Sequence, residues 1–177
     1  MQKIYIKENN INDAVKVLSI ISEFGGSYSK ESLQKELGNN KFLIIVGYVG
    51  ESPVGCLIGF DRFHDGSFYC WLVGVDPVFR GLDIMLLLME YQEKWAKSNN
   101  YKILRIKTRN DSRAMLNYLI KNNFNIIDVR SPKNPKESIV KRYLNLVIIK
   151  TISILNRFLK FESTDAKENR IMLEKHL

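Results

Sequence analysis

Residues 73–88 read VGVDPVFRGLDIMLLL. The pattern predicts a strand that contains a glycine, a turn at the proline, an Arg-Gly pair, and then a long amphipathic helix. The first N–H groups of a helix lack intrahelical partners, and the helix dipole places partial positive charge there. A strand that leads into a helix through a glycine-bearing turn is therefore a geometry suited to binding phosphate.

The composition is that of an ordinary soluble globular protein. The chain has 177 residues, of which 45% are hydrophobic and 26% charged, so we expect one domain over residues 1–177 with a substantial core. The N-terminus lacks the apolar core of a signal peptide, and no apolar run approaches the roughly 20 residues that span a bilayer. Cys56 and Cys70 lie in strand-like segments and are expected to be reduced core thiols. These features predict a cytoplasmic protein.

The charge and the histidine content narrow the function classes. A formal charge of +8 and a pI near 9.4 suit an anionic partner such as a cofactor, nucleic acid or membrane surface, or serve solubility alone. With only His64 and His176, no nucleophile elbow and no clustered metal ligands, hydrolytic triads and zinc sites are unsupported. Walker and dinucleotide glycine motifs are also missing. Group transfer that relies on positioning remains.

The periodicity predicts alternating strands and helices. Gly74 lies inside a strand and indicates a bulge or a close backbone approach there. A capping residue is expected at Asn12 or Asp13 for the first helix and at Ser29 for the second. Strands are predicted at Ile4–Lys7, Lys41–Tyr48, Val54–Asp61, Phe68–Val75, Lys102–Thr108, Asn123–Arg130 and Asn169–Leu173. Helices are predicted from the first cap to Ile21, at Lys30–Leu37, at Leu82–Ser98 with Ile84, Leu87, Leu88, Tyr91 and Trp95 buried, and from Asp111 or Ser112 to Lys121.

Residues 136–162 are predicted to form an amphipathic basic helical insertion before the last strand. Within it, Ser138–Phe161 carries five basic residues and no acidic residue. Its apolar residues would form a broad surface that is rarely tolerated on a soluble monomer. The segment could cover a sheet face, form a dimer interface or dock on an anionic membrane. We favour packing within the chain or dimerisation, because polar residues interrupt the apolar surface.

The order and spacing of these elements resemble the GCN5-related N-acetyltransferase superfamily over Ile4–Arg130, with a final strand near Asn169–Leu173. The resemblance implies an α/β fold with a mixed, mostly antiparallel sheet flanked by helices. In that family the motif Q/R-x-x-G-x-G/A holds the pyrophosphate of acetyl-CoA, and Arg80 occupies its first position. The family also pairs the strand before the motif with pantetheine amides and places an asparagine after the next strand. Implied cofactor contacts are Val73, Gly74, Val75, Arg80, Gly81, Leu82, Asp83, Ile84, Met85, Leu86 and Asn110.

Two motif positions depart from the family pattern. Asp83 stands where the family has glycine, and Met85 stands where it has glycine or alanine. The Asp83 carboxylate would repel a phosphate by about 1–4 kcal/mol at ~4 Å, or it would stabilise the helix dipole by about 0.3–1 kcal/mol. We expect the carboxylate to turn aside, so that cofactor binding is weakened but retained. Met85 is expected to pack.

The residues that would handle protons are less well defined. The family often places a tyrosine four residues before a Gly-Phe pair as general acid. Here the pair is Asn123-Phe124, and the count reaches Leu119, which leaves neighbouring Tyr118 as the catalytic candidate. Asp61, His64, Asp65 and Tyr69 are local candidates for a base. Arg105, Lys107 and Arg109 alternate along one strand face and could attract an anion, although a solvated face is expected.

The resemblance implies an acetyl-CoA-dependent N-acetyltransferase that acts on a primary amine and needs no metal. The acceptor could be a small metabolite, an amino sugar, a peptide terminus or aminoacyl-tRNA; other nucleic-acid partners are not expected. A homodimer is possible. One alternative is a non-catalytic module that binds CoA weakly or not at all. The other is a membrane-surface acyltransferase that works through the basic insertion.

Overall fold

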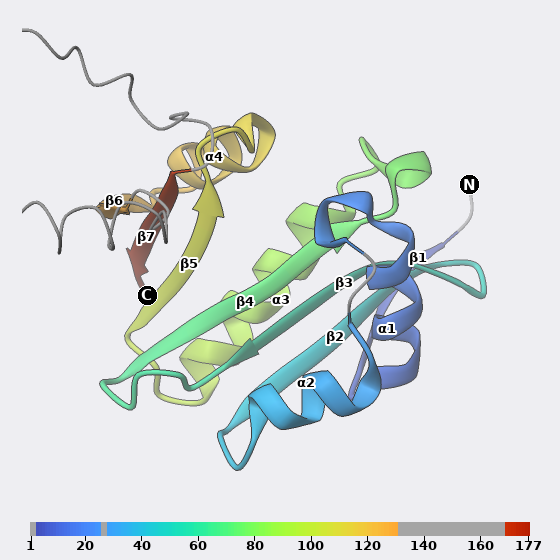
Figure 1. The fold of residues 1–177 in the computed structure, drawn as a ribbon, viewed down its shortest axis with the longest axis horizontal. Coiled ribbons are helices and arrows are strands. Elements are labelled where there is room, and N and C mark those ends of the chain that lie inside the picture. Colours follow the sequence, from blue (N-terminus) through green and yellow to red (C-terminus); the bar gives the residue numbers. More distant parts are fainter. Residues whose placement is uncertain (1–2, 26–27, 131–168) are drawn as a thin grey trace, which may run out of the picture. The chain divides into compact units, whose positions relative to one another are not determined.

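The computed structural model describes residues 3–25, 28–130 and 169–177, so the predicted insertion at residues 136–162 lies outside the described residues. Helices and strands follow one another along the chain in the predicted order: a strand, two helices, three strands, a helix, a strand, a helix and two strands (Figure 1). The strands are β1 (Ile4–Glu8), β2 (Phe42–Val49), β3 (Ser52–Phe60), β4 (Ser67–Val75), β5 (Ile103–Arg109), β6 (Asn125–Arg130) and β7 (Arg170–His176). The helices are α1 (Ile11–Ile20), α2 (Lys30–Leu37), α3 (Ile84–Ser98) and α4 (Arg113–Lys121), with short 3₁₀ turns η1 (Ser22–Phe24) and η2 (Pro77–Phe79).

The strands form one mixed sheet in the order β1-β2-β3-β4-β5-β7-β6. Neighbours from β1 to β4 are antiparallel. β4 and β5 are parallel, as a crossover through α3 requires. The predicted fold class, a mostly antiparallel sheet flanked by helices, is confirmed.

The described residues divide into two compact units. The first contains residues 1–107 and 173–177, and the second contains residues 108–172. In the first unit α1 and α2 cover one face of the sheet and α3 covers the other (Figure 1). The free thiols of Cys56 and Cys70 are both buried in this core, as predicted. No helix in the described ranges is long and apolar enough to cross a membrane.

The beginnings of the first two helices show how local chemistry sets their positions. Ser29 caps α2 as predicted, because its hydroxyl accepts from the Ser32 N–H at 3.2 Å while Ser32 bonds back to the Ser29 N–H at 2.9 Å. The predicted cap of α1 is wrong. Asn10 caps it by accepting from the Asp13 N–H at 3.1 Å, and the Asp13 carboxylate instead accepts from the Tyr48 hydroxyl at 2.7 Å.

Helix α3 begins at Ile84 rather than at Leu82, and its buried stripe differs from the prediction. Leu87 is 36% exposed, whereas Gln92 is fully buried. The buried residues are Ile84, Leu88, Met89, Gln92 and Ala96. Glycines of the sheet cause this rotation. A Cβ on Gly55 would lie 2.8 Å from Ile84 Cγ2, and a Cβ on Gly59 would lie 2.8 Å from Gln92 Nε2. These glycines thus leave room for one row of α3 side chains, spaced four residues apart, to pack against β3.

Of the two features expected at Gly74, a close approach to its backbone is confirmed, and the bulge of β4 lies elsewhere. The register between β3 and β4 shifts between Ile58 and Gly59, which leaves Trp71 as the extra residue of a bulge. Gly74 serves close packing instead, because a Cβ there would lie 2.6 Å from Ile21 Cδ1 and 2.9 Å from Phe24 Cε2. The position of the bulge is therefore set by the pairing of β4 with β3. The need for glycine at position 74 is set by the side chains of the segment after α1.

The second unit contains α4 and the adjoining strand segments. α4 buries Leu116 and Leu119, and Phe124 is buried after it. On β6, Ile126, Ile127 and Val129 are about half exposed. Their exposure means that β6 contributes little to the core of the described part of this unit.

Candidate functional site

The loop between β4 and α3 has a backbone suited to anion binding. The Asp76 side chain accepts from the Val78 N–H at 2.9 Å and caps η2. Gly81 follows with φ +88°, a conformation that glycine adopts freely, and nothing lies within 4 Å of a Cβ built there. Asp83 has φ +56° immediately before α3. Leu87 donates to the Asp83 carbonyl at 3.0 Å, so the N–H groups of residues 84–86 precede the first intrahelical bond and project from the helix end.

Asp83 adopts the left-handed conformation that explains why a glycine suits this position. Aspartate and asparagine are the non-glycine residues that tolerate this region best. The Asp83 side chain is exposed and makes no capping hydrogen bond. Met85 and Leu86 are half-buried, and Leu82 is about half exposed. The altered motif therefore keeps a glycine-like backbone while adding a carboxylate at the helix N-terminus.

Arg80 is held in place by two groups of the first unit. Its Nε donates to the Val75 carbonyl at 3.2 Å, and its Nη2 lies 2.8 Å from Glu23 Oε1 of η1. Hydrogen bonding within η1 and to Arg80 lowers the pKa of Glu23. The guanidinium is thus fixed beside the β4–α3 loop, with a carboxylate as its partner.

Beyond the bulge, one edge of β4 has no strand partner among the described residues. The ladder with β5 runs from Ser67–Ile103 to Cys70–Ile106. Beyond it, Val73 and Val75 remain paired with Leu57 and Gly55 of β3. Since the Asp76 N–H bonds to Val54 of β3, alternation directs the amides of residues 73 and 75 to the opposite side of the strand. These are the two residues predicted to meet an extended amide ligand.

The second unit holds the remaining two predicted site residues. Asn110 directly follows β5, and its N–H donates to the Asn169 carbonyl at 2.9 Å. Tyr118 is half-buried on α4, whereas neighbouring Leu119 is fully buried. Asn123, which replaces the glycine of the expected Gly-Phe pair, has φ +64°. Like Asp83, it is a polar residue with positive φ at a position where the family has glycine.

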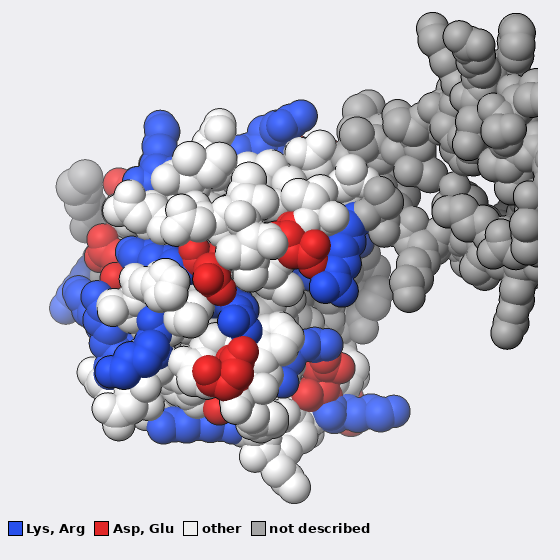
Figure 2. All heavy atoms as spheres, turned by 90° about the vertical axis from the view of Figure 1, so that its left-hand side faces the viewer, with Lys and Arg blue, Asp and Glu red and all other residues white. Residues whose placement is uncertain are grey.

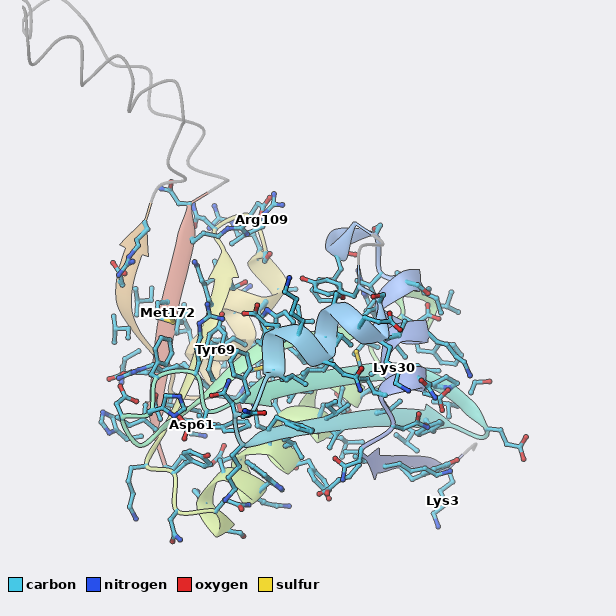
Figure 3. The ribbon with its side chains drawn as sticks, turned by 60° about the horizontal axis from the view of Figure 1, so that its bottom comes forward. Lys3, Lys30, Asp61, Tyr69, Arg109 and Met172 are labelled. Atoms are coloured by element: carbon cyan, nitrogen blue, oxygen red, sulfur yellow. The ribbon has the colours of Figure 1, made fainter. Side chains whose placement is uncertain are left out.

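Three of the four local base candidates are held in the fold, whereas the His64 side chain is 69% exposed and its Nδ1 lies 3.7 Å from Asp61 Oδ1. Asp61 accepts from the His64 N–H at 3.0 Å and from the Tyr101 hydroxyl at 3.3 Å. Burial raises the pKa of Tyr69 to about 12. Hydrogen bonds from Ser67 and Arg105 lower the pKa of Asp65 to about 2. Asp61 and Tyr69 lie at the same end of β3 and β4 (Figure 3).

Arg105 is not part of a solvated strand face. Its guanidinium contacts Asp65 at 2.6 Å, Ser67 at 3.1 Å and Glu174 at 3.2 Å. Arg109 pairs with Asp111. Two of the three predicted alternating cations therefore have carboxylate partners. On the face shown in Figure 2, basic and acidic side chains are interspersed rather than gathered into one basic area.

Acid should weaken the ion pair between Asp65 and Arg105, which joins the β3–β4 hairpin to β5. The pKa of Asp65 is about 2 in the fold, against 3.8 for the free side chain, so the unfolded chain binds more protons between these values. The stabilisation is complete above about pH 5 and is lost as the pH falls through about 4 to 2. We expect Asp65→Asn to melt a few degrees lower at pH 7, since a partly exposed pair contributes about 1 kcal/mol or less.

Thermal melts of Asp65→Asn and wild type from pH 7 to pH 2 test this. The difference in melting temperature should vanish near pH 2, and exposed Glu51→Gln should show no such trend. A difference that is independent of pH would contradict the ion-pair explanation.

Sequence reasoning missed several residues near the bulge. Gln92 is fully buried beside it, and its Nε2 and Oε1 have no hydrogen-bond partner among the described residues. The available signal was a polar residue in an apolar i, i+4 row with Ile84 and Leu88. Glu23 was missed as the partner of Arg80 because the two are 57 residues apart. The bulge at Trp71 depends on the register with β3, which the sequence of β4 alone does not reveal.

The described residues hold no group of three or more histidine, cysteine, aspartate or glutamate side chains that could bind a metal ion. The candidate site is thus built from a helix N-terminus, left-handed loop residues and a strand edge. This arrangement suits a phosphate-bearing ligand with an extended amide arm.

Comparison with known proteins identifies the family. The chain superposes on the ribosomal-protein-S18-alanine N-acetyltransferase of Escherichia coli (TM-score 0.71, 13% identity, covering 98% of this chain and 94% of that one). It also superposes on an IAA acetyltransferase of Bacillus cereus (0.68, 16%, 99% and 100%). A third similar structure is a GNAT family acetyltransferase of Elizabethkingia anophelis with acetyl-CoA bound (0.65, 19%, 98% and 98%). These likenesses show a shared fold. A search of curated proteins finds no significant match. The model of the acetyltransferase (GNAT) family matches residues 16–124, more than half of the chain, and the chain is therefore an N-acetyltransferase of the GNAT family.

Proposed function

We propose that the protein binds acetyl-CoA at the β4–α3 loop and transfers its acetyl group to a primary amine. The observation that carries this proposal is the loop backbone. Gly81 and Asp83 both have positive φ, and α3 follows with the N–H groups of residues 84–86 ahead of its first internal bond. These groups would hold the pyrophosphate, and the free amides of Val73 and Val75 would pair with the pantetheine arm.

We propose that the chain acts as one acetyltransferase domain. The family match at residues 16–124 includes parts of both compact units, which supports one acetyltransferase domain over the chain. Asn110 is proposed as a further cofactor contact and Tyr118 as the proton donor. The formation of a homodimer is also a proposal.

In the proposed reaction the neutral amine attacks the thioester carbonyl, so that a C–N bond forms and the C–S bond breaks. The leaving thiolate takes a proton from Tyr118, and the amine loses one to solvent. Backbone amides near the bulge would polarise the carbonyl, so that orientation and electrostatics carry most of the catalysis. Because Asp61, Asp65 and Tyr69 are held in the fold, we expect solvent rather than these side chains to deprotonate the acceptor amine before it attacks.

An acetyl-transfer assay tests the proposed function. Release of CoA thiol from acetyl-CoA should require both enzyme and a primary amine, and mass spectrometry should find the amine heavier by one acetyl group. At subsaturating amine the rate should rise about tenfold per pH unit below the amine pKa. Thiol release that is independent of every amine tested would refute transfer.

Asp83→Gly should bind acetyl-CoA more tightly than wild type if the Asp83 carboxylate faces the phosphates. The change removes a carboxylate from the helix N-terminus and keeps the left-handed backbone. At a separation of ~4 Å the gain should reach up to about 1–3 kcal/mol, which is roughly 5- to 150-fold in the dissociation constant. Isothermal titration calorimetry of both proteins measures it.

Asp83→Asn is the matched control, because asparagine also tolerates positive φ but carries no charge. If repulsion weakens binding, the asparagine and glycine variants should improve affinity alike. If only glycine improves affinity, the limit is the approach of the backbone to the phosphates. Unchanged affinity in both would show that the carboxylate already points away from the ligand.

A further inference from the structure

The first observation concerns where an acceptor could reach the thioester, and it rests on the proposed function. The β4–β5 ladder ends at Cys70–Ile106, and Trp71 is the bulge residue immediately beyond it. An acetyl group carried along Val73 and Val75 toward the ladder would end beside this residue. Trp71 therefore lies where the reacting amine has to arrive.

One face of the sheet is closed at this point. Phe68 is buried against Trp95 of α3 and Tyr101, with ring centroids 4.9 and 5.1 Å away. Gly59 lets α3 approach so closely that a Cβ there would lie 2.6 Å from the Phe68 ring and 2.8 Å from Gln92. The acceptor must therefore approach from the face that carries α1 and α2.

That second face is lined with aromatic rings. Side chains alternate along a strand, so Tyr69 points away from Phe68, and it lies beside α2 (Figure 3). Trp71 shares its side: its ring centroid is 5.8 Å from Phe60 and 5.9 Å from Tyr28. Both Trp71 and Tyr28 are half-buried. Part of each ring surface is thus open to a ligand.

The charges beside these rings neutralise one another. Arg62 Nη1 lies 3.0 Å from Glu36 Oε1, and the guanidinium sits 5.7 and 5.5 Å from the ring centroids of Phe60 and Tyr69. Burial raises the pKa of Tyr69, and Arg62 and Glu36 both lie close enough to act on it; burial and Glu36 likewise raise the pKa of Tyr28. A carboxylate or a second ammonium on the acceptor would have to break this pair to gain a partner here.

We infer that the preferred acceptor is a primary amine joined by a short chain to an aromatic or similarly flat apolar group, with no second charge beside it. The apolar group packs on Trp71 and Tyr28 and places the amine at the bulge. Trp71 is then a residue that determines acceptor specificity. Phosphorylated amines and free amino acids are disfavoured, because Arg62, the cation over the Phe60 and Tyr69 rings, is already paired with Glu36.

The test compares kcat/KM for four acceptors. 2-Phenylethylamine has the expected structure, and phenylalanine adds a carboxylate to it. Glucosamine carries its amine on a polar ring, and putrescine has a second ammonium group. We expect 2-phenylethylamine to exceed each of the others by at least about tenfold, the discrimination that an apolar pocket provides. Trp71→Ala should remove at least about tenfold of kcat/KM for 2-phenylethylamine with little change for putrescine. Trp71→Phe should keep the preference.

Two further measurements distinguish failure of this inference from failure of the proposed function. Arg62→Ala frees Glu36 and should raise kcat/KM for putrescine, while the dissociation constant of acetyl-CoA stays the same in all variants and reports that they are folded. Acetylation with equal efficiency across the panel, or a preference that survives Trp71→Ala, would overturn this inference and leave the proposed function standing. Absence of acetyl-CoA binding by wild type would instead refute the proposed function.

Discussion

Replacing Tyr118 with phenylalanine is expected to lower kcat about 10- to 1000-fold, because the variant lacks the proposed general acid. The leaving thiolate needs a proton, and the change removes one hydroxyl while keeping the ring. Leu119 stands at the position where the family pattern has its tyrosine, but it is fully buried and its side chain has no acidic proton to donate. Tyr118 is the phenol on α4, and it is half-buried.

Steady-state thiol release should show the fall in kcat, and calorimetry should show acetyl-CoA affinity within about twofold of wild type, since the phenol would act on the transition state. Tyr91→Phe is the matched control. Its hydroxyl donates to Glu8 at 2.6 Å, so its loss should leave kcat unchanged. Activity of Tyr118→Phe within twofold of wild type would assign Tyr118 to packing and proton donation to water.

Gly59→Ala is expected to destabilise the fold strongly although it adds a single methyl group. The new Cβ would lie 2.6 Å from Phe68 Cε1, 2.8 Å from Gln92 Nε2 and 2.9 Å from the Tyr69 carbonyl oxygen. The ring is fully buried and the carbonyl is backbone, so neither can move aside easily. Overpacking of this kind costs about 1–3 kcal/mol or more, which corresponds to a melting temperature lower by roughly 2–12 °C.

Gly47→Ala provides the comparison within the same sheet. A Cβ at Gly47 would lie 3.2 Å from Ile84 Cγ2 and 3.8 Å from Leu88 Cδ2, both of which are ends of side chains. Its melting temperature should stay within about 2 °C of wild type, because alanine also restricts the unfolded chain. Equal destabilisation of the two variants would show that glycine is needed in these strands for reasons other than the close contact at Gly59.

Features set by neighbouring residues could be predicted from the sequence. The α2 helix begins after Ser29 as expected, because its cap bonds to a residue three positions away. The turn at Asp76 and the glycine conformation at Gly81 follow from the chemistry of the same short segment. The order of helices and strands along the chain could also be predicted, since it follows from hydrophobic periodicity and turn residues.

Features set by distant residues could not be predicted in this way. The bulge at Trp71 depends on the register with β3. The inward face of α3 depends on where glycines open space in the sheet. Arg105 pairs with residues 40 and 69 positions away, so its strand pattern could not reveal that it is neutralised.

The candidate site divides in the same way. The loop from Gly81 to Asp83 has the backbone that its sequence position required, and positive φ at Asp83 accounts for the family glycine it replaces. The pairing of Arg80 with Glu23 came from the fold alone. The roles of Asn110 and Tyr118 remain predictions.

A calorimetric titration of the protein with acetyl-CoA tests the central claim most directly, because the loop, the free edge of β4 and the end of α3 are all proposed to hold this one ligand. We predict a dissociation constant of about 100 μM or lower, which corresponds to roughly −5.5 kcal/mol or more favourable. Arg80→Ala with Gly81→Val in the same chain should weaken binding at least about tenfold, because the pair removes the guanidinium and forces a β-branched residue into positive φ. No binding heat from wild type at millimolar acetyl-CoA, over a range of temperatures, would contradict the account.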